Sequence, residues 1–139
     1  MNVTTRLEVA IGHRLLGYDG KCSHIHGHNY VFEVSLSGKA GPLGMVIDFK
    51  DLKKVLREIL EPFDHALVLH EEDPVSDFLQ SEKSVLLSVN PTAETFASLV
   101  FGKLIDRNMP PCRVVVRETE DGWAEATGVD RSVKIKAVQ

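Results

Sequence analysis

Two segments of alternating apolar and polar residues, 5–13 and 26–37, constrain most strongly how this 139-residue chain can fold. A period of two residues predicts β-strands with one buried face. His13 continues the apolar face at the end of the first segment, and His26 and His28 continue it at the start of the second. In an antiparallel hairpin the end of the first strand lies beside the start of the second. The pattern therefore predicts that three imidazoles converge at one end of one sheet face.

Three converging imidazoles are typical of catalytic zinc sites. Zinc binds histidine nitrogens, and three protein ligands leave a fourth position open for water or substrate. We therefore predict that His13, His26 and His28 are metal ligands. His24 has the same strand parity as His26 and His28, so spacing alone does not separate it from them. Zinc is inferred from the ligand type only, and iron or nickel suits the same ligands.

A loop over 14–25 is expected to cover this end of the sheet, and it carries Cys22. The thiol is either a fourth ligand, which would close a structural site, or a thiolate that acts as base or nucleophile. The residues alone leave both interpretations open. The second cysteine is Cys112, and two cysteines in a chain of this size do not indicate a disulfide framework.

The remaining segments predict the fold class. We expect a helix over 50–60 capped by Asp48, a helix over 92–107 preceded by Asn90 as the cap and Pro91 in its first turn, a short helix near 75–80, and strands over 45–49, 84–89, 113–119, 123–127 and 132–138. This order predicts an α+β protein with an antiparallel four-stranded sheet and two helices packed on one face. The length fits a single domain over 1–139.

Two further groups of polar residues have the chemistry of a site. Asp64 and His65 are either an acid/base pair or a solvated pair, and adjacent residues of a strand would point to opposite faces. Glu118 ends the apolar row of the strand over 113–119. Its carboxylate could accept hydrogen bonds from a heterocycle or form an ion pair with Arg113 or Arg117.

Composition argues against two classes of partner. The formal net charge of -4 and the pI of about 5.8 do not fit a nucleic-acid surface, which needs a clustered basic face. No apolar run approaches the ~18 residues of a membrane span, and the N-terminus has no signal-peptide layout. We therefore expect no membrane partner and a cytoplasmic location.

Short motifs occur along the chain in this order: GHRL at 12–15, CSHIHGH at 22–28, GMVIDF at 44–49, DH at 64–65, PTAE at 91–94 and RET at 117–119. Together they resemble the family of 6-pyruvoyl-tetrahydropterin and 6-carboxy-tetrahydropterin synthases. The resemblance implies the tunnelling fold (T-fold), in which the sheets of three subunits close into a barrel. It also implies a homohexamer of two stacked trimers with active sites at the subunit interfaces.

The resemblance also implies a role for each matching residue. His13, His26 and His28 match the zinc ligands, Cys22 the catalytic cysteine, Asp64 and His65 its proton-relay partners, and Glu118 the residue that anchors the pterin. Asp64 and His65 would reach Cys22 from a neighbouring chain. His24 matches no motif position. Arg14 and Lys21 lie near the site in the sequence and are expected to contact a triphosphate.

The implied substrate is 7,8-dihydroneopterin triphosphate. We favour the carboxy-forming activity, which yields 6-carboxy-5,6,7,8-tetrahydropterin with release of acetaldehyde and triphosphate, on the way to queuosine-type 7-deazapurines. One alternative is the pyruvoyl-forming activity, which eliminates triphosphate only. Another is a non-catalytic, zinc-stabilised assembly domain in which Cys22 is a fourth ligand.

Overall fold

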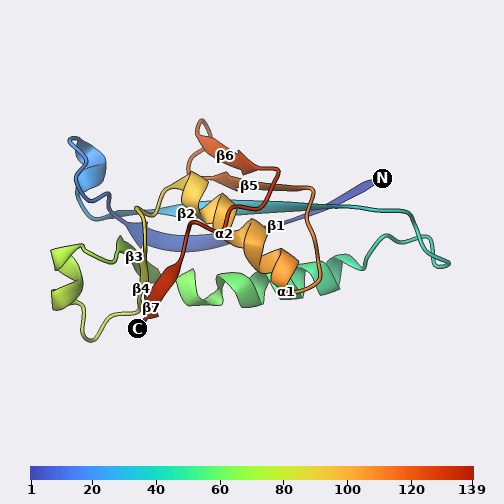
Figure 1. The fold of residues 1–139 in the computed structure, drawn as a ribbon. Coiled ribbons are helices and arrows are strands. Elements are labelled where there is room, and N and C mark those ends of the chain that lie inside the picture. Colours follow the sequence, from blue (N-terminus) through green and yellow to red (C-terminus); the bar gives the residue numbers. More distant parts are fainter.

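The computed structural model describes all residues, 1–139, and its central element is a seven-stranded β-sheet in the order β6-β5-β2-β1-β3-β4-β7 (Figure 1). The strands are β1 (Asn2–His13), β2 (His26–Ser37), β3 (Ala66–His70), β4 (Ser84–Leu87), β5 (Arg113–Arg117), β6 (Trp123–Ala126) and β7 (Ile135–Val138). The α-helices are α1 (Phe49–Leu60) and α2 (Ala93–Asp106). Three short 3₁₀ turns are η1 (Lys21–Ser23), η2 (Glu61–Phe63) and η3 (Pro74–Phe78).

The predicted hairpin forms the centre of the sheet. β1 and β2 pair antiparallel along their whole length, from Asn2 opposite Ser37 to His13 opposite His26. Side chains directly opposite each other in such a pair lie on the same face. His13 and His26 therefore meet at the closed end of the hairpin, beside the loop over 14–25.

The prediction of a four-stranded antiparallel sheet is wrong. β3 runs parallel to β1 and β4 runs parallel to β3, while β7 pairs antiparallel with β4 at the far edge. Parallel neighbours need a crossover connection of about a dozen residues or more. The acidic segment over 71–83, which includes η3, is the connection between β3 and β4, and this is why it shows no strand pattern of its own.

A strand expected over 45–49 is absent. The N–H of Gly41 donates a hydrogen bond to the carbonyl of Met45 at 2.9 Å, and Gly44 has a positive φ of 76°. These features make the segment a turn. Asp48 ends it, because its carboxylate accepts a hydrogen bond from the N–H of Lys50 at 2.8 Å and caps α1 as predicted.

The cap of α2 differs from the prediction. Thr92, and not Asn90, is the N-cap residue, and its hydroxyl accepts a hydrogen bond from the N–H of Thr95 at 3.3 Å. Pro91 precedes the helix and leaves its carbonyl free for another partner. The side chain of Asn90 therefore takes no part in capping α2.

Both helices pack into one core with the inward face of the sheet. Tyr30 and Phe32 of β2 contact Phe96 of α2, with Tyr30 and Phe96 edge to face at a centroid distance of 5.2 Å. Each fully buried aromatic or aliphatic side chain stabilises the fold by about 1.5–3 kcal/mol. The core ends at His13, which is 2% exposed. None of the helices is long and apolar enough to span a bilayer.

Two glycine substitutions should change stability in opposite directions. Gly102 lies inside α2, and an added Cβ would meet nothing closer than Arg131 at 3.6 Å. Gly102→Ala should therefore raise the free energy of unfolding by about 0.5–1 kcal/mol. At Gly27 an added Cβ would lie 3.0 Å from the carbonyl oxygen of Ile11. Gly27→Ala should therefore lower it by about 1–3 kcal/mol, since the hairpin has to move apart.

Urea unfolding followed by circular dichroism measures both effects. Stabilisation by Gly27→Ala would contradict the close contact at Gly27, and destabilisation by Gly102→Ala would contradict the room for a methyl group at Gly102.

Candidate active site

The imidazoles of His13, His26 and His28 lie together at the closed end of the hairpin. Ring centroids are 4.5 Å apart for His13 and His26, 5.3 Å for His13 and His28, and 5.1 Å for His26 and His28. One nitrogen from each ring lies within 4.8 Å of the other two. The structure thus brings together the three side chains that strand parity predicts.

Hydrogen bonds decide which ring nitrogen is free in two of these histidines. Nδ1 of His13 lies 2.7 Å from the carbonyl oxygen of Pro91, and Nδ1 of His26 lies 2.7 Å from that of His24. Because a carbonyl oxygen only accepts, both Nδ1 atoms carry the hydrogen. In the neutral rings each Nε2 then has a lone pair, and these two Nε2 atoms are 3.1 Å apart. Facing lone pairs repel, so a cation bound between the two Nε2 atoms would stabilise this arrangement.

His28 supplies the third nitrogen. Its Nε2 is buried and has no hydrogen-bond partner, which is costly for a polar atom unless a ligand satisfies it. Burial lowers the pKa of His13, against the raising effect of its hydrogen bond to Pro91, and so favours the neutral, metal-binding form. Three neutral imidazole nitrogens are a ligand set of catalytic zinc. These residues therefore fit a zinc-type metal ion.

Tyr30 and Glu118 lie next to the histidine cluster. The buried Tyr30 hydroxyl donates a hydrogen bond to Oε1 of Glu118 at 2.8 Å. That oxygen lies 3.4 Å from Nε2 of His13 and 3.7 Å from Nε2 of His28. Burial, with the hydrogen bond and the charge of Glu118, raises the pKa of Tyr30, so its hydroxyl remains a donor. Glu118 is thus held beside the histidines with its charge close to them.

Neither of the two arginines considered as an ion-pair partner for Glu118 pairs with it. Arg113 pairs with Glu125 at 2.9 Å, and Arg117 pairs with Glu33 at 3.2 Å. These arginines face the other side of the strand from Glu118, as alternation along β5 requires. The carboxylate of Glu118 therefore has no arginine partner and keeps acceptor capacity for a ligand.

Cys22 lies in η1 and opens into a cavity of about 340 Å³ that is also lined by His13, Glu94 and Glu118. The ligand atoms close enough to share one ion include neither the thiol of Cys22 nor the imidazole of His24, and His24 is exposed. This geometry favours a thiol that faces a ligand cavity over a fourth metal ligand.

Asp64 and His65 lie together, contrary to the expectation of opposite faces. Nδ1 of His65 is 2.8 Å from Oδ1 of Asp64, and both side chains are exposed, at 80% and 49%. His65 precedes β3 and has a left-handed φ of 56°, so strand alternation does not apply to this pair.

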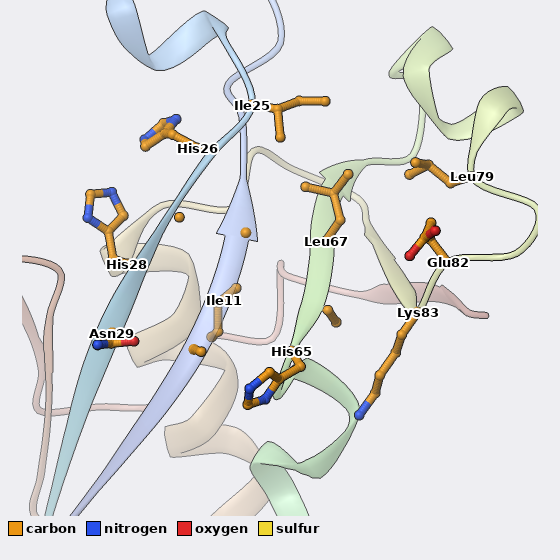
Figure 2. A pocket seen from close by; sticks show the side chains of 14 residues that line it. Ile11, Ile25, His26, His28, Asn29, His65, Leu67, Leu79, Glu82 and Lys83 are labelled. Carbon is orange, nitrogen blue, oxygen red and sulfur yellow. The ribbon is translucent and has the colours of Figure 1, made fainter.

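His65 lines a second hollow, of about 630 Å³, that does not contain Cys22 (Figure 2). Gly12 and Gly27 line it and belong to the face of the hairpin opposite the imidazoles, and His26 and His28 line its edge as well. Figure 2 shows the side chains of His26 and His28 on one side of the hairpin, and Leu67, Leu79 and Lys83 on the other. Within one chain, therefore, His65 and Cys22 line different hollows, and Asp64 lines neither of the two.

Sequence patterns did not reveal two contacts of the site. Tyr30 shares the face of His26 and His28, but its bond to Glu118 depends on β5 lying next to β2. Arg14 makes the second contact, because its Nε donates a hydrogen bond to the buried carboxylate of Asp73 at 2.7 Å. The expected contact of Arg14 with a triphosphate stays a prediction.

The histidine assignment is tested by single alanine substitutions. His28→Ala should weaken metal binding by at least about 10–100-fold, because one of three ligand nitrogens is lost. His24→Ala is the matched control, since it removes an exposed imidazole of the same segment and should leave the metal content unchanged. Metal analysis after dialysis, with chelator competition, measures both, and a loss of metal in His24→Ala would contradict the assignment.

The chain is similar to proteins of one known family. A family model described as 6-pyruvoyl tetrahydropterin synthase matches residues 2–129. A 6-carboxy-5,6,7,8-tetrahydropterin synthase from Rickettsia felis is 41% identical over 101 residues, which cover 68% of this chain and 73% of the relative. A protein of the same name from Rickettsia typhi is 35% identical over 133 residues, or 88% of this chain and 96% of the relative.

Solved structures show the same fold. The 6-pyruvoyl tetrahydropterin synthase of Caenorhabditis elegans superposes with a TM-score of 0.67 at 26% identity, covering 92% of this chain and 95% of that chain. An uncharacterised protein from Wolinella succinogenes has a TM-score of 0.76 at 20% identity, covering 91% and 97%, and supports the fold alone. The family that the motifs suggest is thus confirmed, and the fold of the single chain is that of its solved relatives: this chain belongs to the 6-pyruvoyl tetrahydropterin synthase family of pterin synthases.

Proposed function

We propose that this protein is a zinc-dependent lyase that converts 7,8-dihydroneopterin triphosphate to 6-carboxy-5,6,7,8-tetrahydropterin, with release of acetaldehyde and triphosphate. The observation that carries the proposal is the three-histidine cluster next to a cavity that contains both Cys22 and Glu118. The names of the relatives from Rickettsia felis and Rickettsia typhi support the carboxy-forming reaction over the alternatives. The product places the protein in queuosine-type 7-deazapurine synthesis, and we propose that residues 1–139 act as one such domain.

His13, His26 and His28 would hold the zinc ion through their Nε2 atoms. Bound there, zinc supplies Lewis-acid polarisation to the hydroxyl-bearing side chain of the substrate. Neither Cys22 nor Glu118 is needed to hold the metal, which leaves both side chains for the substrate.

Glu118 would bind the pterin ring. Its carboxylate accepts a hydrogen bond from Tyr30 and has no cationic side chain of lysine or arginine as a partner. A carboxylate oxygen can accept further hydrogen bonds from the amino group and the ring N–H of a pterin. The cavity of about 340 Å³ has the size of a small-ligand site.

Cys22 would remove a proton from the substrate side chain as its thiolate. It lines the same cavity as His13, so the thiol and one of the proposed metal ligands border a common space. A base close to a polarised substrate group accelerates proton abstraction by about 10²–10⁴-fold. Asp64 and His65 would complete the relay by carrying protons to and from Cys22.

We further propose a homohexamer in which Asp64 and His65 reach Cys22 from a neighbouring chain. Both side chains are exposed, and in the single chain His65 lines a different hollow from Cys22, while Asp64 lines neither of the two. An exposed acid/base pair with no substrate cavity shared with the cysteine is consistent with a site completed by assembly. No nucleic acid or membrane partner is proposed.

Turnover assays distinguish the candidate functions. Purified protein incubated with 7,8-dihydroneopterin triphosphate should release acetaldehyde and triphosphate together. Release of triphosphate without acetaldehyde would instead establish the pyruvoyl-forming alternative.

The role of Cys22 is tested by a pair of cysteine variants. Cys22→Ala should reduce turnover by at least about 10²-fold while zinc is retained. Cys112→Ala is the control, because Cys112 lies before β5 and its thiol contacts the carbonyl of Ser35 at 3.3 Å. It should leave turnover close to wild type. Loss of zinc together with unfolding in Cys22→Ala would support the zinc-stabilised assembly domain instead.

The shared site is tested by mixing two inactive variants. Cys22→Ala and His65→Ala should each be inactive, whereas co-expressed chains should regain activity at about a quarter of their sites by random assortment. The restored sites combine an intact Cys22 with an intact His65 from a neighbour. If co-expression restores nothing while mixed oligomers form, the two residues act within one chain.

A further inference from the structure

The loop over 14–25, which carries Cys22, is held almost without apolar burial. None of its residues is buried, and Tyr18, Asp19, Gly20 and Lys21 are exposed. Segments with few buried contacts open locally at low free-energy cost unless hydrogen bonds hold them. The position of the thiol therefore depends on a small number of polar contacts.

The side chain of Asn90 makes two of these contacts. Its Oδ1 accepts a hydrogen bond from the N–H of Leu16 at 2.8 Å, and its Nδ2 donates one to the carbonyl of Leu16 at 2.9 Å. Among side chains of this length only an amide both accepts and donates in this way. The next contact leads directly to the cysteine, because the N–H of Leu15 donates to the carbonyl of Cys22 at 2.9 Å.

Asn90 itself is fixed at the start of α2. Its carbonyl accepts hydrogen bonds from the hydroxyl of Thr95 at 2.8 Å and the N–H of Thr92 at 3.0 Å. The following residue, Pro91, accepts the hydrogen bond of His13 Nδ1. Two adjacent residues thus contact the first predicted metal ligand and the cysteine loop, and α2 anchors both.

A role in helix capping does not account for the Asn90 side chain. Thr92 caps α2, and the amide of Asn90 points instead to a residue 74 positions earlier in the chain. The side-chain amide of Asn90 hydrogen-bonds Leu16 of the cysteine loop, while the neighbouring Pro91 hydrogen-bonds His13.

We propose that Asn90 is a positioning residue that holds the Cys22 loop at the correct distance from the histidine cluster, through its paired hydrogen bonds to Leu16. The inference rests on the proposed function for its catalytic consequence only. Its structural consequence, the placement of the thiol, is independent of any substrate.

Two variants of Asn90 test the proposal in the zinc-loaded, full-length protein. Asn90→Ala removes both hydrogen bonds. Asn90→Asp keeps the acceptor for the Leu16 N–H but places a carboxylate oxygen where Nδ2 lay 2.9 Å from the Leu16 carbonyl. In both variants the backbone contact between Pro91 and His13 is untouched, so zinc content should be unchanged.

Alkylation of Cys22 by iodoacetamide measures the loop without substrate. Loss of the Asn90 hydrogen bonds should increase opening of the loop and raise the alkylation rate by about 2–10-fold. Peptide mass spectrometry separates Cys22 from Cys112. Turnover of dihydroneopterin triphosphate should fall by about 10–100-fold in kcat, with a much smaller change in KM, because a misplaced base weakens the reaction step more than binding.

Ser88→Ala is the matched control. Ser88 lies in the same segment, and its hydroxyl accepts a hydrogen bond from the N–H of Lys134 at 2.9 Å, a contact that does not involve the cysteine loop. This variant loses a comparable side-chain contact, so it reports any effect of reduced stability alone. It should show wild-type alkylation and kcat.

The outcomes separate the inference from the proposed function. Faster alkylation in the Asn90 variants with normal zinc supports the positioning role, even if wild-type protein does not turn over the pterin. Unchanged alkylation in both variants overturns it, as does an equal increase in Ser88→Ala. If Asn90→Ala does not fold, Asn90→Asp decides between these results, since it retains one of the two hydrogen bonds. Absence of wild-type turnover counts against the proposed function alone.

Discussion

The register between β1 and β2 is the constraint on which the rest of the structure depends. It places His13 opposite His26 and Ile11 opposite His28, so all three imidazoles share one face. A shift of one residue would move the histidines of one strand to the opposite face, together with every core side chain of that strand. The same ladder of hydrogen bonds that buries Tyr30, Phe32 and Val34 therefore also assembles the site.

The site extends the apolar core with polar groups that the protein cannot satisfy by itself. Pro91 and His24 take the Nδ1 hydrogens of two imidazoles and turn both Nε2 lone pairs toward each other. The buried Nε2 of His28 has no hydrogen-bond partner. Such an arrangement is unfavourable in an empty core and favourable around a cation, which is the physical reason to regard the cluster as a metal site.

Polar contacts, and not apolar packing, hold the remaining parts of the site. Tyr30 hydrogen-bonds Glu118. Arg14, the residue after His13, hydrogen-bonds the buried Asp73 in the β3–β4 connection. The side chain of Asn90, just before α2, hydrogen-bonds the backbone of Leu16 in the loop. Elements that are distant in sequence thus converge on the loop of Cys22, and hydrogen-bond geometry, which is directional, determines where the thiol lies.

The sequence by itself determined the local parts of this protein. Period-two alternation located β1 and β2 and the shared face of His13, His26 and His28, because parity and an antiparallel hairpin are local properties. The same reasoning located α1 with its Asp48 cap and the approximate limits of α2. Motif order indicated the family.

Only the tertiary structure decided which distant segments are neighbours. Strand order made the sheet seven-stranded and mixed, because nothing within β3 or β4 specifies a parallel partner. The pairing of Asp64 with His65, the bond from Tyr30 to Glu118 and the use of Asn90 by Leu16 depend on a left-handed turn, on strand adjacency and on the cap chosen by Thr92. Side-chain partners across long sequence separations follow from packing of the whole chain, and periodicity carries no information about them.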